Sequence, residues 1–517
     1  MATRSRHGCL DCKRAKVKCD EIHPSCGTCK RRGRQCSGYA QVTKAHKARA
    51  SLTGQTPSNS AASPLVTTIP AEDQVNGVGE GTVQASPAVG SPMVTDDLAI
   101  APFSPFSTEI APTPVPQLFK TMSNIPPGTV HPSDEPFIEV YFTRHPTELV
   151  FGSEFVNEMN SCVLKVFQNS PMAVGDSLSA IGEAYLKDHK SQAMVPVPNR
   201  RARILARLRS LDSQGVSLEL LLTVMLGLCA VELIDTSEKP EKMSALPSLL
   251  DNLSMMLDHH INRGFELTQL SKYFIRALAR QDMMISLVRF HRPRIPTSYW
   301  LDDHSKEHAD RFMGYTGTLM PILGDLCALA EDIRTPIPDG LLSPNSEDLT
   351  FSMALHDPII LVERAAQLQS QLELWHPTVD STLSFQSSRK FLMHANAYRS
   401  AALLYLHRLI NPAGSSVEAD QAALTMAYEV MVHTSGEDDD LKMSLWPIFL
   451  AACEVSNEAD RMTASYMLGA VCRARKTVTS TRTRAFVINR VWNARDNAID
   501  WNWMTLSEQH PNDLLPI

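Results

Sequence analysis

The sequence has no apolar run long enough to cross a lipid bilayer. Its longest run, Leu220–Val231, has 12 residues and lies between Glu219 and Glu232, whereas a membrane-spanning helix needs about 18–20. We therefore expect a buried helix here and no membrane partner. The first residues carry charge but lack the apolar stretch of a secretory signal peptide. This predicts an intracellular protein whose thiols stay reduced.

The sequence also lacks the short motifs of common catalytic sites. It contains no glycine-rich phosphate loop, no HExxH motif of zinc proteases and no GxSxG nucleophile elbow. We therefore expect that the protein is not an enzyme. Aromatic residues are scarce, at 6%, and there are 33 prolines. Together these values predict that part of the chain does not pack into a core.

Basic residues are in the minority overall but not near the N-terminus. The net charge is −7, yet residues 1–50 hold 13 Lys and Arg against 3 Asp and Glu. This segment therefore carries +10 and the remainder −17. A strongly basic segment on an acidic chain favours a polyanionic partner for that segment.

Composition divides the 517 residues into three predicted parts. Residues 1–50 are basic and rich in cysteine. Residues 51–133 hold 13 of the 33 prolines and show no helical periodicity. They cannot bury enough apolar surface to offset their conformational entropy, so we predict a disordered linker rich in Pro, Ser and Thr. Residues 134–517 are predicted to form a large all-α domain.

Helical spacing recurs throughout this third part. Apolar residues share one helical face over 361–372, and Asp357-Pro358 before them is typical of a helix start. Further helices are predicted near 200–211, 218–234, 268–290, 398–409, 461–476 and 483–495. No repeat of fixed length is present, so a solenoid built on a sequence repeat is not expected.

Six of the 11 cysteines lie within the first 36 residues. They are Cys9, Cys12, Cys19, Cys26, Cys29 and Cys36. The spacing repeats, because each half has a Cys-x2-Cys pair and, after six further residues, a third cysteine. The two sulfurs of such a pair can both reach one tetrahedral zinc ion, at about 2.3 Å. We therefore predict a metal site and not a disulfide framework.

Counting ligands constrains this site. Two separate tetrahedral zinc ions need eight ligand positions, and six cysteines fill only six of them. Either two ligands come from elsewhere or two thiolates bridge both ions. The internal repeat favours bridging by its equivalent residues, Cys9 and Cys26. A metal-free or disulfide-bonded cluster, and a single zinc ion held by four of the cysteines, are less favoured alternatives.

Residues 8–20 read GCLDCKRAKVKCD, and Pro24 precedes Cys26 by two positions. This pattern resembles the fungal Zn₂Cys₆ binuclear zinc clusters. The resemblance implies a small zinc-stabilised cluster of two short helices with two zinc ions per chain. It assigns Cys9, Cys12, Cys19 and Cys26 to one ion and Cys9, Cys26, Cys29 and Cys36 to the other. Such zinc is structural, because thiolates take every coordination position.

The C-terminal part carries a second resemblance. Residues 398–408, 445–452 and 491–496, with Trp501, are similar to the helical fungal transcription-factor domain found beside such clusters. Together the two resemblances imply a nuclear, sequence-specific regulator of RNA polymerase II genes. Its partners would be double-stranded DNA and the transcription machinery or co-regulators. The alternatives are a zinc-dependent protein-interaction module of the ubiquitin-ligase type and a helical enzyme with a zinc appendage.

Basic residues between the second and third cysteines are the candidate DNA contacts. They are Lys13, Arg14, Lys16 and Lys18. Zinc modules of this class place such a segment in the major groove, where Lys or Arg can bind guanine O6 and N7. By resemblance, Lys16 reads a base of a CGG-like triplet and the other three contact phosphates. The basic stretch 30–34 is predicted to contact the DNA backbone or to direct nuclear import.

Residues 37–50 contain no apolar heptad, so a coiled-coil zipper is not expected. DNA binding as a monomer and homodimerisation through the helical domain both stay open. Three other features have a functional and a plain interpretation. A candidate metal site, or else a solvated turn, consists of Asp303, His304 and His308. The stretch 437–440 is either an acidic activation element or an exposed loop. Residues 96–109 are a candidate activation segment within the linker.

Overall fold

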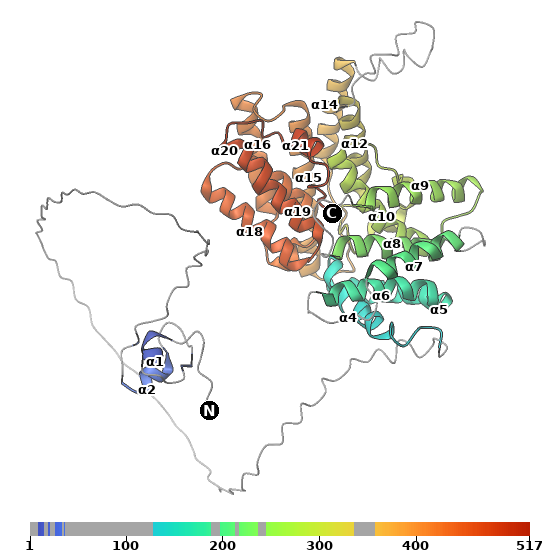
Figure 1. The fold of residues 1–517 in the computed structure, drawn as a ribbon. Coiled ribbons are helices and arrows are strands. Elements are labelled where there is room, and N and C mark those ends of the chain that lie inside the picture. The colour runs from blue at the N-terminus through green and yellow to red at the C-terminus, as the bar shows by residue number, and fades with distance from the viewer. Residues whose placement is uncertain are drawn as a thin grey trace, which may run out of the picture. The chain divides into compact units, whose positions relative to one another are not determined.

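The computed structural model of the protein describes residues 9–14, 19–20, 26–33, 36, 128–187, 197–211, 217–235, 244–334 and 357–517 (Figure 1). The chain divides into two units, Met1–Ser107 and Thr108–Ile517. The described parts of both units are helical, with a single isolated β-bridge between Asp310 and Gly314. None of the described helices is long and apolar enough to cross a membrane.

The described residues of the first unit form two short helices, α1 (Leu10–Arg14) and α2 (Gly27–Arg31). Cys26 caps α2, since its thiol accepts a hydrogen bond from the backbone N–H of Cys29 at 3.2 Å. The predicted cluster of two short helices is thereby confirmed. Of the segment predicted as a linker, residues 51–127 lie outside the described residues.

The second unit is a large helical domain, as predicted. Its helices before residue 335 are α4 (Glu135–Leu149), η1 (Ser153–Phe155), α5 (Val156–Asn169), α6 (Pro171–Lys187), α7 (Val197–Leu211), α8 (Leu218–Ile234), α9 (Leu246–Asn262), α10 (Gln269–Arg289), η2 (Thr297–Tyr299), α11 (Asp303–Glu307), η3 (Gly317–Leu319) and α12 (Met320–Arg334). Those after residue 356 are α14 (Pro358–Leu374), α15 (Phe385–Ile410), α16 (Val417–His433), η4 (Asp438–Leu441), α17 (Leu445–Glu454), α18 (Glu458–Ala474), α19 (Val478–Phe486), η5 (Val487–Trp492), α20 (Asn493–Asp496) and α21 (Trp503–Gln509).

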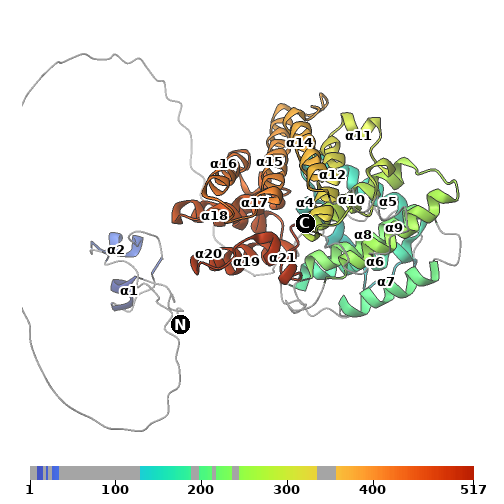
Figure 2. The same ribbon diagram turned by 90° about the horizontal axis from the view of Figure 1, so that it is seen from above.

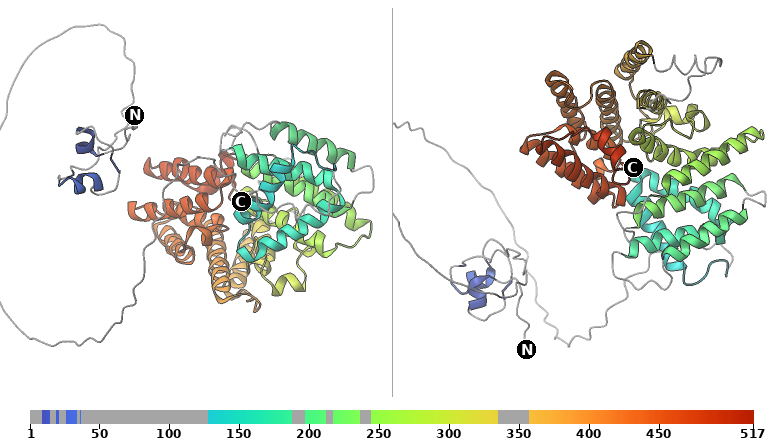
Figure 3. Two further views of the ribbon diagram at one scale, coloured as in Figure 1. Left: turned by 90° about the horizontal axis from the view of Figure 1, so that it is seen from below. Right: turned by 45° about the horizontal axis from the view of Figure 1, so that its top comes forward.

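The helices of this domain form two halves around one continuous core. Helices α4 to α10 gather on one side and α15 to α20 on the other, and the C-terminal end lies between them (Figures 1, 2 and 3). Aromatic residues join the halves, because the Tyr405 hydroxyl of α15 donates to the Leu287 carbonyl of α10 at 2.8 Å. Tyr398 and Trp446, from two of the segments that carry the family resemblance, are also fully buried here.

Local sequence signals explain several helix boundaries. Asp357 caps α14 as predicted, since its carboxylate accepts the N–H of Ile359 at 2.9 Å. The predicted helix at 483–495 is interrupted, because α19 ends at Phe486 and the π-helix η5 follows. A π-helical turn is rare and occurs mostly as a single-turn insertion within an α-helix. Here Trp492 donates to the Ala452 carbonyl of α17 at 2.8 Å.

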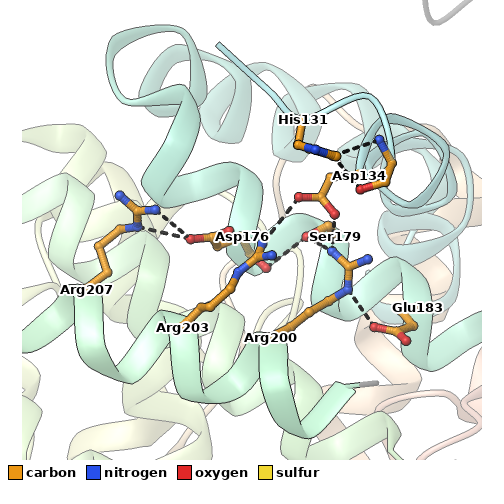
Figure 4. A network of polar contacts seen from close by, with 9 residues as sticks. His131, Asp134, Asp176, Ser179, Glu183, Arg200, Arg203 and Arg207 are labelled. Atoms are coloured by element: carbon orange, nitrogen blue, oxygen red, sulfur yellow. Dashed lines mark hydrogen bonds and ion pairs between the residues drawn. The ribbon is translucent and has the colours of Figure 1, made fainter. Parts of the chain in front are cut away.

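A buried ion-pair network joins α4, α6 and α7 (Figure 4). Asp134, the N-cap of α4, pairs with Arg200 of α7. Arg200 also donates to Glu183 of α6 at 2.6 Å, and both side chains are 0% exposed. Just before this network, Val130 packs in the core. The packed domain therefore begins before residue 134, whereas the linker was predicted to extend to residue 133.

Candidate metal centre

The cysteine sulfurs of the first unit gather into two groups of four. Cys9, Cys12, Cys19 and Cys26 form the first tetrad, and Cys9, Cys26, Cys29 and Cys36 form the second. Within each tetrad the sulfurs all lie within 4.8 Å of one another. Cys9 and Cys26 belong to both tetrads, so their sulfurs, 3.5 Å apart, occupy the positions of bridging ligands.

The spacing of the sulfurs suits tetrahedral zinc. Two sulfurs at about 2.3 Å from one tetrahedral ion lie about 3.8 Å from each other. The Cys12 and Cys26 sulfurs of the first tetrad are 3.6 Å apart, and those of Cys9 and Cys29 in the second are 3.7 Å apart. All donors are sulfur, the ligand type that selects zinc over hard cations such as Mg²⁺.

The backbone around the sulfurs repeats with the sequence. In the first half, the Cys9 N–H donates to the Cys19 sulfur at 3.4 Å and the Cys12 N–H to the Cys9 sulfur at 3.4 Å. In the second half, the same bonds recur 17 residues later, from Cys26 to Cys36 at 3.4 Å and from Cys29 to Cys26 at 3.2 Å. These N–H donors stabilise negative charge on the sulfurs, as zinc ligation requires. The two halves therefore form the same backbone hydrogen bonds to their sulfurs.

The cluster thiols lie close together. None of the 11 cysteines forms a disulfide bond in the structure. Withdrawal from water raises the pKa of the Cys9, Cys12 and Cys26 thiols above the usual value. Without a cation these sulfurs therefore hold protons at neutral pH. A divalent cation displaces the protons, so metal binding at this site releases protons and weakens in acid.

One carboxylate links the two halves and was not anticipated from the sequence. Asp20 follows Cys19, and its Oδ2 accepts a hydrogen bond from the Thr28 hydroxyl at 3.3 Å. The same oxygen lies 3.6 Å from an Arg31 guanidinium nitrogen. Asp20 therefore contacts α2 from the first half of the cluster. An acidic residue next to a thiolate centre carries no sequence signal for this role.

The predicted DNA contacts are only partly described. Lys13 and Arg14 lie at the end of α1, and Arg14 is exposed. Lys16 and Lys18 lie outside the described residues. In the second half, Lys30 and Arg31 are exposed on α2, in agreement with an outward-facing basic stretch.

The candidate metal site at Asp303, His304 and His308 is a solvated turn. His304 and His308 stack ring on ring at 4.2 Å, and the Asp303 side chain is 95% exposed. These three residues do not close on one point, and the described residues contain no ligand cluster beyond the cysteine tetrads. The activation segment predicted at 96–109 lies outside the described residues.

The acidic stretch 437–440 is held by basic residues of the same domain. Arg473 pairs with Asp438 at 2.6 Å. Lys390 lies 3.1 Å from Asp439 and 3.4 Å from Asp440. These contacts favour a structural loop between α16 and α17 over a free activation element.

Two sulfur tetrads beside two short helices, followed by a large helical domain, define a chain with an N-terminal cysteine cluster of the zinc-binding kind. Residues 7–46 match the fungal Zn(2)-Cys(6) binuclear cluster domain, and residues 137–516 match the fungal specific transcription factor domain. The second match covers well over half of the chain, so the protein belongs to this family of fungal transcription factors. The two matching descriptions name a zinc-cysteine cluster and a transcription factor domain, which places the chain in a family of zinc-cluster transcription factors.

Individual relatives match over short stretches. An uncharacterised transcriptional regulatory protein of Schizosaccharomyces pombe is 58% identical over 33 residues, 6% of either chain. The aspercryptin biosynthesis cluster-specific transcription regulator atnN of Emericella nidulans is 50% identical over 40 residues, 8% of this chain and 7% of its own. White-opaque regulator 2 of Candida albicans is 44% identical over 41 residues, 8% and 9% of the two chains. The chain thus spans less than a tenth of these relatives. No solved structure matches it.

Proposed function

We propose that residues 1–50 form a DNA-binding domain that holds two zinc ions and reads CGG-like triplets. One ion is held by the first tetrad and the other by the second, with Cys9 and Cys26 bridging. Residues 51–133 connect this domain to a regulatory domain over 134–517. The protein acts in the nucleus on genes transcribed by RNA polymerase II.

The sharing of two sulfurs between the tetrads supports this proposal most directly. Four sulfurs within 4.8 Å of one another complete a tetrahedral shell. A shell made of thiolates alone leaves no position for water or substrate, so the zinc shapes the fold and takes no part in chemistry. The alternative of a ubiquitin-ligase type module is not favoured, since such modules use eight ligands and lack a basic helix between them.

The charge of the cluster supports DNA as its partner. Six thiolates and two Zn²⁺ sum to −2, while residues 1–50 as a whole carry +10 before the thiolates are counted. The excess positive charge lies in a segment of about 50 residues and favours contact with phosphates. By resemblance, Lys16 reads the base edge, and Lys13, Arg14 and Lys18 bind phosphates.

Replacing Lys16 tests this assignment. Lys16 lies in the sequence between the proposed ligands Cys12 and Cys19. We expect Lys16→Ala to cost about 1–3 kcal/mol at a cognate site and to relax discrimination at one guanine. Lys13→Ala should weaken binding to cognate and random DNA by the same factor and reduce the salt dependence of binding. Fluorescence anisotropy with matched and single-mismatch duplexes at several salt concentrations measures both effects.

Equal zinc content in the two variants is the control for this comparison. If Lys16→Ala weakens binding equally for every sequence, Lys16 is a phosphate contact, and Arg14 becomes the next candidate base reader.

The helical domain is proposed to contact the transcription machinery or co-regulators. Because residues 37–50 contain no heptad, any homodimer would pair through this domain. We therefore expect the isolated segment 1–50 to bind a single half-site as tightly as the full chain. Anisotropy on half-site and paired-site duplexes makes the comparison. Dimerisation through the helical domain would be shown if the full chain bound paired-site duplexes much more tightly than the segment 1–50 does, while the two bound half-site duplexes equally.

A further inference from the structure

The helical domain encloses a cavity between α4, α5, α6, α8 and α10. It measures about 70 Å³. One buried water needs roughly 10–15 Å³ on this measure, so the cavity has room for several atoms. Its wall is mostly apolar, with contributions from Leu178, Ile181, Ala230 and Phe274. A cavity of this kind with a few convergent polar groups is the usual form of a small-molecule site.

Three arginines also line this cavity, and each is almost fully buried. Arg280, Arg311 and Arg475 are 3%, 2% and 4% exposed. No acidic residue is among the described residues that line the cavity. Positive charge therefore faces an apolar space without a carboxylate in its wall.

Arg475 and Arg280 have weak local partners. Among the described residues, the Arg475 guanidinium donates to the Met443 sulfur at 3.8 Å, and its Nε has no hydrogen-bond partner there. Arg280 donates to the Met443 carbonyl at 3.5 Å and to the Tyr398 hydroxyl at 3.4 Å. Within the described part of the chain, neither guanidinium forms an ion pair. The burial of Arg475, together with the positive charge of Arg280, lowers the pKa of Arg475 to about 9.

Arg311 adds unused donors on the α10 side. One of its terminal nitrogens donates to the Tyr273 carbonyl at 2.8 Å, while its Nε and Nη1 lack hydrogen-bond partners. Nη1 lies 3.7 Å from the Asp310 carboxylate, which Arg276 also contacts at 3.1 Å. Asp310 is thus shared between two cations and does not neutralise Arg311 completely.

Buried cations without counter-ions are unusual, because an unpaired buried charge destabilises the fold strongly. Arg200 shows the ordinary arrangement in this same domain, since the carboxylates of Glu183 and Asp134 surround it. Among the described residues, Arg475 and Arg280 have no such carboxylate, and Arg311 has only Asp310, which it shares with Arg276. Their charge is best satisfied by an anion that enters from solution and has an apolar body to fill the rest of the cavity.

We propose that this cavity binds a small monocarboxylic acid with a compact apolar body. Its carboxylate pairs with Arg475 and Arg280, and its body packs against the wall of α6, α8 and α10. Arg311 closes the polar side of the site. The helical domain is then a sensor of a small organic acid. This inference concerns the second unit alone and does not depend on how the zinc cluster reads DNA.

Thermal unfolding of the full-length zinc-loaded protein tests the proposal. Sodium hexanoate and sodium benzoate are compared with 1-hexanol and benzyl alcohol at the same concentrations, with sodium chloride matching the ionic strength. We expect the carboxylates to raise the Tm of the helical domain by about 2 °C or more near saturation. The alcohols should leave the Tm within error, because they cannot pair with a guanidinium.

Three variants locate the effect. Arg475→Met should abolish the carboxylate shift, and Arg473→Met should retain it, since Arg473 is a half-exposed residue paired with Asp438 outside the cavity. Ala230→Leu keeps every arginine but fills the cavity, so it should also abolish the shift, which protects the test if Arg475→Met folds poorly. The proposal is overturned if no carboxylate raises the Tm, if the alcohols raise it equally, or if Ala230→Leu keeps the full shift.

Discussion

Cys9→Ala is expected to remove both zinc ions from the protein. Cys19→Ala should leave the zinc of the second tetrad in place and the first tetrad only partly occupied. The reason is geometric, because the Cys9 sulfur belongs to both tetrads and the Cys19 sulfur to the first alone. A structural zinc ion contributes about 10–16 kcal/mol of binding free energy, which in so small a unit is folding free energy. Cys9→Ala should therefore also abolish DNA binding.

Metal analysis of the purified full-length protein, with anisotropy on a cognate duplex, measures both effects. The unchanged protein should contain two zinc ions per chain. Cys36→Ala is the matched control, since Cys36 belongs to the second tetrad alone. Shared ligation would be contradicted if the unsubstituted protein contained only one zinc ion per chain. It would also be contradicted if Cys9→Ala and Cys36→Ala lost the same amount of zinc.

Arg200→Met is expected to destabilise the helical domain by about 3–5 kcal/mol. The guanidinium is 0% exposed and pairs with Glu183 and Asp134. Removing one member of a buried ion pair leaves carboxylate charge in a medium that solvates it poorly, and breaking such pairs costs about this much. Urea unfolding followed by circular dichroism at 222 nm reports mostly on the helices of the second unit.

Arg207→Met on the same helix is the matched control. Arg207 pairs with Asp176 at 2.9 Å, but its side chain is 31% exposed, so water screens the pair. Its loss should cost no more than about 1 kcal/mol. Similar losses for the two variants would show that burial does not control the strength of this network.

The two cysteine tetrads could be predicted from the spacing of the cysteines in the sequence. Cysteine positions repeat every 17 residues, and the hydrogen bonds of Cys9 and Cys26 repeat with them. Spacing could predict this because a Cys-x2-Cys turn and one short helix set the ligand positions within a few residues. Asp20 was missed for the opposite reason. Its partner Thr28 is brought to it by the folded cluster and by no pattern in the sequence.

The helical class of the second unit was equally accessible, since apolar periodicity is a property of neighbouring residues. Helix boundaries were predicted where a cap marks them, as at Asp357. The interruption after Phe486 was not predicted, because apolar periodicity does not distinguish a π-turn from an α-helical turn; in the fold, Trp492 at its end donates to the Ala452 carbonyl.

By itself, the sequence determined the zinc-cluster class, the ligand residues to expect and the separation into a basic and a helical part. Only the tertiary structure decided which arginines are paired. Arg200 meets Asp134 across 66 positions of sequence, whereas Arg475 meets the apolar cavity and the sulfur of Met443. The residue type is the same in both places. What differs is the set of groups that packing brings within a few ångströms, and buried charge is stabilised or destabilised by those neighbours alone.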